Sequence, residues 1–156
     1  MESPRTEAVW TRLAVRGMRR TPQREAIIEV LERAGEALPL PVVLARSRRR
    51  APGLGERTAE RTVALLVDSG AIDAIRTPDG VVVYRLCGGG HHHHVVCGAC
   101  GAIAELSGCE VGDWATAEAE RQGFLVEGHD VTVHGVCASC RVSAGAIPPG
   151  RTPARA

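Results

Sequence analysis

The chain has 156 residues, 44% of them hydrophobic and 24% charged, which suits one compact domain or two small ones. No apolar run approaches the ~18 residues of a membrane span, and acidic residues near Met1 argue against a secretory signal, so we expect a cytoplasmic protein with no membrane partner. The net charge of +1 is uneven, because residues 1–86 carry fifteen Arg against eleven acidic residues and residues 87–156 carry four against seven. The first half is therefore the candidate for binding a polyanion.

Helical and β patterns follow one another in residues 1–86. Thr21 is a good N-cap with Pro22 at the first helical position, and Gly35 ends that helix after an apolar stripe at helical spacing. The segment RTPDG has the Pro and Gly of a turn and joins two β-rich runs into a hairpin. In chain order we expect helices over residues 7–15, 22–34, 41–50 and 56–69, and then strands over residues 71–75 and 81–86.

The segment ERTAERTVALLVDSG forms the fourth of these helices and is the predicted recognition element. Its apolar stripe begins at Ala59 and leaves Arg57, Glu60 and Arg61 on another face. Short helices followed by a hairpin are typical of a winged helix-turn-helix, in which one helix enters the DNA major groove and the hairpin lies beside it. We therefore expect Arg57, Thr58, Glu60 and Arg61 to contact double-stranded DNA.

The second half has a different pattern, with strands over residues 91–96 and 102–106, a helix over 111–122 and a strand pair within 124–134. The predicted fold class is α+β, a winged helix-turn-helix followed by a small α/β domain. The predicted divisions are a DNA-binding domain at 1–86, a Gly-rich hinge at 87–90, a metal-binding domain at 91–142 and a disordered tail at 143–156.

Six cysteines in a reducing compartment indicate metal binding rather than disulfides. Cys97-x-x-Cys100 and Cys137-x-x-Cys140 have the pattern of a zinc site made of four thiolates. Structural zinc can supply ~10 kcal/mol or more of folding free energy, which a small domain needs. Ordinary thiols and a thioredoxin-like redox pair are the alternatives, but CGAC leads into a β-prone run where the redox motif should open a helix.

Four consecutive histidines occupy residues 91–94. In a strand, odd and even positions face opposite ways, so this run can serve two sites. All six histidines lie at or beyond position 91, so the DNA-binding half can offer only carboxylate or thiolate ligands. Asp73 and Cys87 together with His92 and His94 give an S, N, N, O set suited to Zn(II) and spanning both domains. A solvated polar patch is the alternative.

These motifs resemble the Fur superfamily of metal-responsive repressors, and within it the zinc-uptake regulators of actinobacterial type, called Zur. The likeness covers about residues 15–140 and rests on GMRRTPQREAIIEVL, RTAERTVALLVDSGAI, VYRLCGGGHHHHVVCGACG and GHDVTVHGVCASC. It implies a homodimer whose winged helices grip DNA while the C-terminal domains, each stapled by zinc, form the dimer. It also implies about two zinc ions per chain, placed by position on Cys97, Cys100, Cys137 and Cys140 (structural) and on Asp73, Cys87, His92 and His94 (sensing).

The chain departs from the family pattern at a third metal site. The resemblance implies His91, His93 and His129 there, together with a glutamate whose position is Gly112 here. We therefore expect the third site to be weak or empty. The alternative is a thiolate from Cys109, which shares the helical face of position 112 if the helix begins that early.

A second departure lies in the recognition helix, which typically reads T-V-Y-R in the family and here reads Thr58-Ala59-Glu60-Arg61. Glu60 either pairs with Arg57 and Arg61 and orients an arginine toward phosphate, or accepts a hydrogen bond from a base edge in the major groove. The operator sequence depends on which of these holds.

The predicted function is a zinc-responsive repressor that binds operator DNA as a homodimer when zinc occupies the sensing site, without a small-molecule substrate. Control of zinc-uptake genes is implied by the resemblance. A family sensor of another metal (nickel, iron) or of peroxide is the nearest alternative, because a His-rich site also accepts Ni(II). A zinc enzyme is disfavoured, since the H-x-E and P-C-x-x-C pattern of deaminases is missing. A metal-carrying interaction protein without DNA binding is the third possibility, which a salt-dependent DNA shift assay separates from a repressor.

Overall fold

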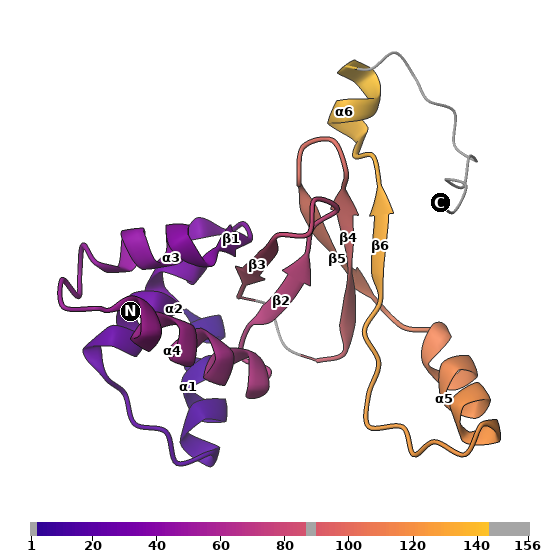
Figure 1. Ribbon diagram of the computed structural model, residues 1–156, viewed down its shortest axis with the longest axis horizontal. Coiled ribbons are helices and arrows are strands. Elements are labelled where there is room, and N and C mark those ends of the chain that lie inside the picture. Colours follow the sequence, from indigo (N-terminus) through magenta and orange to yellow (C-terminus); the bar gives the residue numbers. More distant parts are fainter. Residues whose placement is uncertain (1–2, 87–89, 144–156) are drawn as a thin grey trace.

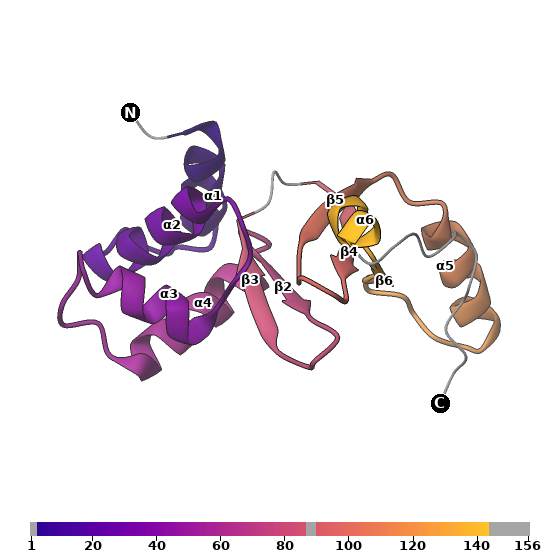
Figure 2. The same ribbon diagram turned by 90° about the horizontal axis from the view of Figure 1, so that it is seen from above.

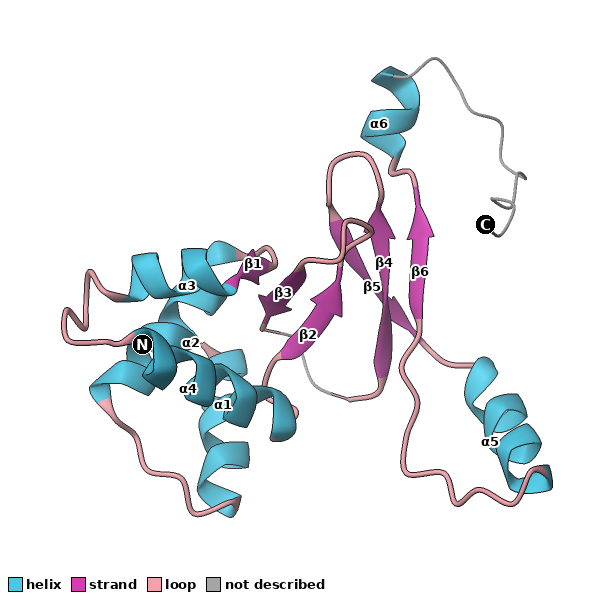
Figure 3. Ribbon diagram, viewed as in Figure 1, coloured by secondary structure: helices cyan, strands magenta, loops and turns pink. Residues whose placement is uncertain are grey.

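The computed structural model describes residues 3–86 and 90–143, and its mixture of helices and short strands confirms the predicted α+β class (Figures 1 and 3). The helices are α1 (Pro4–Val15), α2 (Pro22–Ala34), α3 (Leu40–Ser47), α4 (Glu56–Asp68), α5 (Val111–Arg121) and α6 (Ala138–Ser143). The strands are β1 (Leu38–Pro39), β2 (Asp73–Arg76), β3 (Val82–Arg85), β4 (His92–Cys97), β5 (Ile103–Ser107) and β6 (Thr132–Gly135). No helix in these two described ranges is both long and apolar enough to cross a lipid bilayer.

Local capping chemistry sets the helix boundaries in the first half. The Thr21 side chain accepts a hydrogen bond from the Arg24 amide at 3.3 Å, as expected of an N-cap. Gly35 follows α2 with φ of +62°, a left-handed conformation that glycine adopts without steric cost. Helix α1 begins at Pro4, earlier than predicted, because Ser3 caps it by accepting from the Thr6 amide.

One apolar core joins α1 to α4 with β1 and the segment leading into β2. Ile27, Val43 and Ala59 are completely buried in it. On α4 the buried stripe begins at Ala59 as predicted and continues through Thr62, Val63 and Leu66, whereas Val67 is only half-buried. The first half therefore has a hydrophobic core of its own.

A small antiparallel sheet of order β1-β3-β2 completes this half, and β2 and β3 form the predicted hairpin. Strand β1 is not predicted from the sequence, because its two residues include a proline. It pairs with β3 so that Leu38 lies opposite Tyr84.

The second sheet has the order β5-β4-β6, with β4 antiparallel to β5 and parallel to β6. The predicted strand pair within residues 124–134 is wrong, because only β6 forms there and residues 124–131 have no regular structure. Gly128 and Asp130 disfavour a strand in that segment. Helix α6, which contains Cys140, is also absent from the sequence prediction.

The sheet of β1, β3 and β2, whose β2–β3 hairpin we call the wing, lies beside the second sheet in both views of the ribbon (Figures 1 and 2). Ile75 and Val83 from the wing form a small buried cluster with Val96, and Ile103 packs against it. The Arg85 guanidinium on β3 donates to the Ile103 carbonyl at 3.0 Å and lies 3.7 Å from the Glu105 carboxylate. Most of the predicted hinge (87–89) and nearly all of the predicted tail (144–156) lie outside the described residues.

Candidate metal centres and DNA interface

Three groups of side chains in the described ranges bring potential metal-ligand atoms within 4.8 Å of one another, and each group takes ligands from β4 or the residue before it. The thiolate cluster consists of Cys97, Cys100, Cys137 and Cys140. The sheet-bridging cluster consists of Asp73, His92 and His94. The His-Cys cluster consists of His91, His93, Cys109 and His129.

The thiolate cluster joins the end of β4 to the segment that runs from β6 into α6. The Sγ atoms of Cys100 and Cys137 lie 3.7 Å apart, close to the ~3.8 Å between two thiolates on a tetrahedral zinc with bonds of about 2.3 Å. Hydrogen bonds from the backbone N–H groups of Cys137, Cys100 and Ala99 lower the pKa of Cys97 to about 6. Hydrogen bonding to neighbouring thiols raises the pKa of Cys140. The backbone therefore already favours a thiolate at the buried end of the cluster, which suits a metal cation.

The sheet-bridging cluster brings together ligands from different sheets, since Asp73 begins β2 and both histidines lie on β4. The Oδ2 atom of Asp73 lies 2.6 Å from Nε2 of His92 and 3.4 Å from Nε2 of His94. Both imidazoles are largely withdrawn from solvent, with side-chain exposures of 14% and 10%. Cys87, the fourth predicted ligand, lies outside the described residues.

Protonation differs between the two histidines of the sheet-bridging cluster. Burial opposes the charge of His92, but hydrogen bonds to the Gly90 carbonyl and the Asp73 carboxylate outweigh it and raise the pKa of His92. Burial lowers the pKa of His94 despite the nearby carboxylate. A neutral imidazole is the form that binds a metal, and the Asp73 carboxylate balances the positive charge that a cation adds.

The His-Cys cluster confirms that odd and even histidines face opposite sides of β4. The Nε2 atoms of His91 and His93 lie 3.2 Å apart, and Sγ of Cys109 lies 3.1 Å from Nε2 of His129. Sequence reasoning gives three candidate ligands here, with Cys109 as an alternative fourth, and the structure brings the sulfur of Cys109 into the same cluster. The sequence argument for Cys109 required α5 to begin early enough to include it. Helix α5 begins at Val111 instead, and Cys109 reaches the cluster from the loop before the helix. A glycine in the first turn of α5, three residues after a cysteine, is the signal that points to it.

Helix α4 presents the predicted DNA-contacting residues to solvent. Arg57, Thr58, Glu60 and Arg61 are all exposed, while Ala59 between them is buried. Within the described ranges, no hydrogen bond or ion pair joins Glu60 to either arginine. Glu60 therefore forms no ion pair with Arg57 or Arg61 in this structure, and both alternatives for its role on DNA stay predictions.

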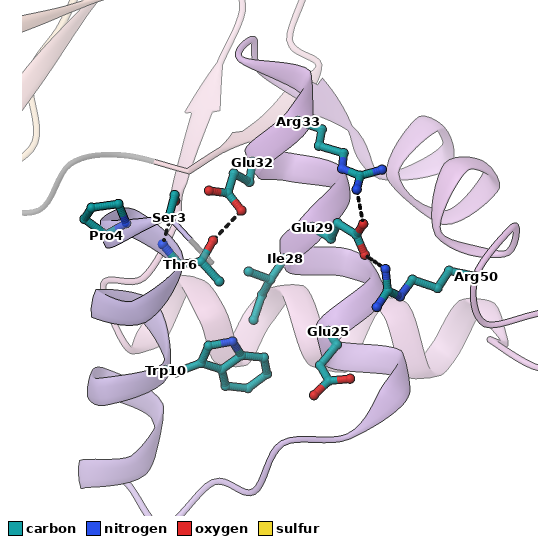
Figure 4. A pocket seen from close by; sticks show the side chains of 10 residues that line it. All are labelled: Ser3, Pro4, Thr6, Trp10, Glu25, Ile28, Glu29, Glu32, Arg33 and Arg50. Carbon is teal, nitrogen blue, oxygen red and sulfur yellow. Dashed lines mark hydrogen bonds and ion pairs between the residues drawn. The ribbon is translucent and has the colours of Figure 1, made fainter. Parts of the chain in front are cut away.

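A groove of about 770 Å³ lies between α1 and α2 (Figure 4), and no member of the three clusters lines it. Two of its carboxylates are engaged within the fold: Glu29 pairs with Arg33 and Arg50, and Glu32 accepts a hydrogen bond from Thr6. These contacts fix the first two helices against each other and against the end of α3. Their role is structural.

Comparison with known proteins identifies relatives of this chain among metal-uptake regulators. The Ferric uptake regulator family profile matches residues 15–134. The zinc uptake regulation protein of Mycobacterium tuberculosis (strain ATCC 25618 / H37Rv) is 36% identical over 129 residues, which cover 83% of this chain and 99% of that protein. The ferric uptake regulation protein of Bacillus subtilis (strain 168) is 33% identical over 124 residues, covering 77% of this chain and 83% of that protein.

Solved structures agree with these sequence relatives. A zinc uptake regulator complexed with zinc and DNA superimposes with a TM-score of 0.73 at 25% identity, over 92% of this chain and 99% of that one. The Helicobacter pylori ferric uptake regulator superimposes with a TM-score of 0.63 at 21% identity, over 88% of this chain and 91% of that one, and supports the fold alone. From the match of the family profile and the 36% identity along most of its length, this chain belongs to the ferric uptake regulator family.

Proposed function

We propose that the chain is a zinc-responsive repressor that binds operator DNA as a homodimer when the sheet-bridging cluster holds zinc, and that it controls genes for zinc uptake. The observation that carries the proposal is the convergence of Asp73 from the wing with His92 and His94 from the second sheet. The names of the Mycobacterium tuberculosis relative and of the zinc- and DNA-bound structure support it. Both names describe regulators, and a protein that acts on chromosomal DNA would work in the cytoplasm.

Asp73, His92, His94 and Cys87 would hold the sensing ion with one oxygen, two nitrogens and one sulfur, a donor set that zinc accepts in tetrahedral geometry. Bound there, zinc supplies directional bonds between ligands of two different sheets. The Asp73 carboxylate would attach the wing to the ion, and the imidazoles of His92 and His94 would attach β4 to the same ion. The contact of Ile75 and Val83 with Val96 gives the wing a surface on which to settle in that orientation.

Orientation of the wing sets the position of α4, which follows from its place in the same core. Arg57 and Arg61 contact phosphates, which gives affinity without sequence information. Glu60 either orients one of these arginines or accepts from the amino group of a cytosine. In a dimer, two copies of α4 must lie about one turn of DNA apart to bind together. Zinc binding and DNA binding then strengthen each other by the same factor, as linkage requires.

A second copy of the chain is the proposed partner of the C-terminal part. Apolar side chains there stay uncovered, although monomeric proteins rarely expose large apolar patches. Leu125 is 89% exposed and Trp114 is 66% exposed. The other exposed large apolar side chains beyond residue 110 are Val111, Phe124, Val133, Val136 and Val142. Burial of this surface between two copies, with the thiolate cluster holding the structural zinc in each, accounts for it.

The experiment is a DNA shift assay with the full chain, first stripped of the sensing metal and then titrated separately with Zn, Fe, Mn and Ni. The duplex is one selected from a random pool by the zinc-loaded protein. Zinc should produce binding at the lowest metal concentration, and Asp73→Asn and Cys87→Ser should remain folded dimers that no longer respond. Binding that needs no metal, or that responds to iron, manganese or nickel before zinc, overturns the proposal.

A further inference from the structure

The His-Cys cluster draws its members from separate parts of the chain. His91 lies just before β4 and His93 within it, Cys109 lies in the loop between β5 and α5, and His129 lies in the segment between α5 and β6. Imidazole rings of His91 and His129 stand 4.5 Å apart between centroids, and those of His93 and His129 stand 5.2 Å apart. The cluster thus gathers three imidazoles and one sulfur around a common centre.

The spacing of the donor atoms suits one tetrahedral cation. Zinc bonds of about 2.1 Å to nitrogen and 2.3 Å to sulfur place neighbouring donor atoms about 3.5 Å apart. In the cluster, the two measured pairs are separated by 3.2 Å and 3.1 Å, and all four atoms lie within 4.8 Å of one another. Movements of a few tenths of an ångström in two or three side chains would bring the set to that geometry.

Gly112 explains why the sulfur stands where the family places a carboxylate. A Cβ atom at position 112 would lie 2.9 Å from Cε1 of His129 and 3.3 Å from Sγ of Cys109. Gly112 lies in the first turn of α5, where glycine costs about 1 kcal/mol relative to alanine, and it does not have a positive φ that would require glycine. Space for Cys109 and His129 is therefore what requires the missing side chain.

The start of α5 also holds the sulfur in place. The Gly112 amide donates to Sγ of Cys109 at 3.2 Å, and Glu110, the residue at the N-cap, offers no side-chain cap. Cys109 is thus both the side chain that caps α5 and a potential metal ligand.

We propose that His91, His93, His129 and the Cys109 thiolate form a third metal site in this chain, with sulfur replacing the family carboxylate. The site takes Zn(II), and Co(II) in its place, in preference to Mn(II) or Mg(II), because three imidazoles and a thiolate are a soft donor set. The proposal does not depend on the sensing role of the sheet-bridging cluster. It raises the expected content from two zinc ions per chain to about three.

The test measures metal content and the chemical reactivity of each cysteine in the full chain. After dialysis against metal-free buffer, elemental analysis should find one zinc fewer per chain in Cys109→Ser than in the wild type, and one fewer in His129→Gln. Iodoacetamide labelling followed by peptide mass spectrometry should show that zinc protects Cys109 in the wild type and that His129→Gln removes this protection while leaving Cys97 protected. Zinc affinity at this site should fall by more than about 10-fold in either variant, the loss typical of removing even a supporting group.

Two outcomes overturn the proposal. One is equal labelling of Cys109 with and without zinc in the wild type, a result that needs no variant to fold. The other is an unchanged zinc content in both variants. Cys87→Ser is the matched control, because it removes the sensing ion and should leave Cys109 protected. In the wild type, failure of the sensing proposal would show as labelling of Cys87 that zinc does not change, and this readout is independent of Cys109.

Discussion

Replacement of Cys97 by serine should separate the stability of the two halves of the chain. Cys97 is 4% exposed at the end of β4, where its sulfur accepts from the Cys137 amide at 3.3 Å. Serine keeps the volume approximately but removes a thiolate from the cluster that we assign to structural zinc. We expect the segment from β4 to α6 to unfold and the chain to become monomeric, while α1 to α4 remain folded.

The magnitude follows from how little apolar surface the second half buries. Only Val96 and Cys97 are buried among its hydrophobic residues in the described ranges, and α5 and α6 contain no buried residue. Complete burial of one valine contributes about 1.5–3 kcal/mol, whereas structural zinc contributes about 10 kcal/mol or more. Loss of the metal therefore removes the larger part of the folding free energy of this half, and side-chain packing cannot replace it.

Hydrogen exchange measured by mass spectrometry resolves the two halves, and sedimentation gives the oligomeric state. Cys97→Ser should lose exchange protection in β4, β5 and β6 and keep it in α2 and α4. Cys87→Ser is the control for the chemistry of the substitution, since we assign Cys87 to the sensing ion and not to the structural one, and it should keep protection in both halves. Full protection of β4 in a dimeric Cys97→Ser protein would refute the reasoning.

Three further substitutions test other parts of the structure. Glu60→Gln should relax the preference at one base pair of the operator by ~1–3 kcal/mol in a DNA titration with an unchanged salt slope, whereas a uniform change across operators would speak against base contact. Thr6→Val should destabilise the fold near neutral pH, because hydrogen bonds from Ser3 and Thr6 lower the pKa of Glu32; that stabilisation is present above the ordinary pKa of 4.5 and is lost as pH falls through the lowered value. Urea unfolding at several pH values should therefore show the difference shrinking on acidification, and growth of the difference would contradict the assignment. Val133→Lys places a charge on the exposed face of β6 and should shift the protein to a monomer in sedimentation, with exchange protection in α2 unchanged.

Local signals in the sequence account for the parts of the fold that could be predicted. Thr21, Pro22 and Gly35 act through their own backbone and immediate neighbours, so α2 has the predicted limits. Strand β1 and the segment 124–131 could not be predicted in the same way, because β1 exists only through its pairing with β3, and a short β-prone segment forms a strand only where a partner is available.

Among the candidate metal ligands, too, those in local sequence patterns could be predicted and those that depend on tertiary structure could not. Both C-x-x-C pairs are local patterns, and the alternation of the histidines follows from strand geometry alone. The role of Cys109 depends on tertiary structure, because residues 122–131 run back from the end of α5 and bring His129 to its beginning. Spacing along the chain carries no information about that return, and only the unexplained glycine at position 112 indicates it.

The position of β4 as the central strand has a consequence for how its register is specified. A slip of one residue turns every side chain of a strand to the opposite face, yet four identical neighbours would still present imidazoles on both faces after such a slip. Residues 91–94 therefore cannot fix their own alignment. The alignment is set at the other end of β4, by the completely buried side chain of Val96 and by Cys97, whose backbone pairs with Gly135. A fifth histidine inserted before Val95 would consequently leave both faces supplied with ligands, whereas an insertion between Val96 and Cys97 would displace the thiolate cluster from the strand.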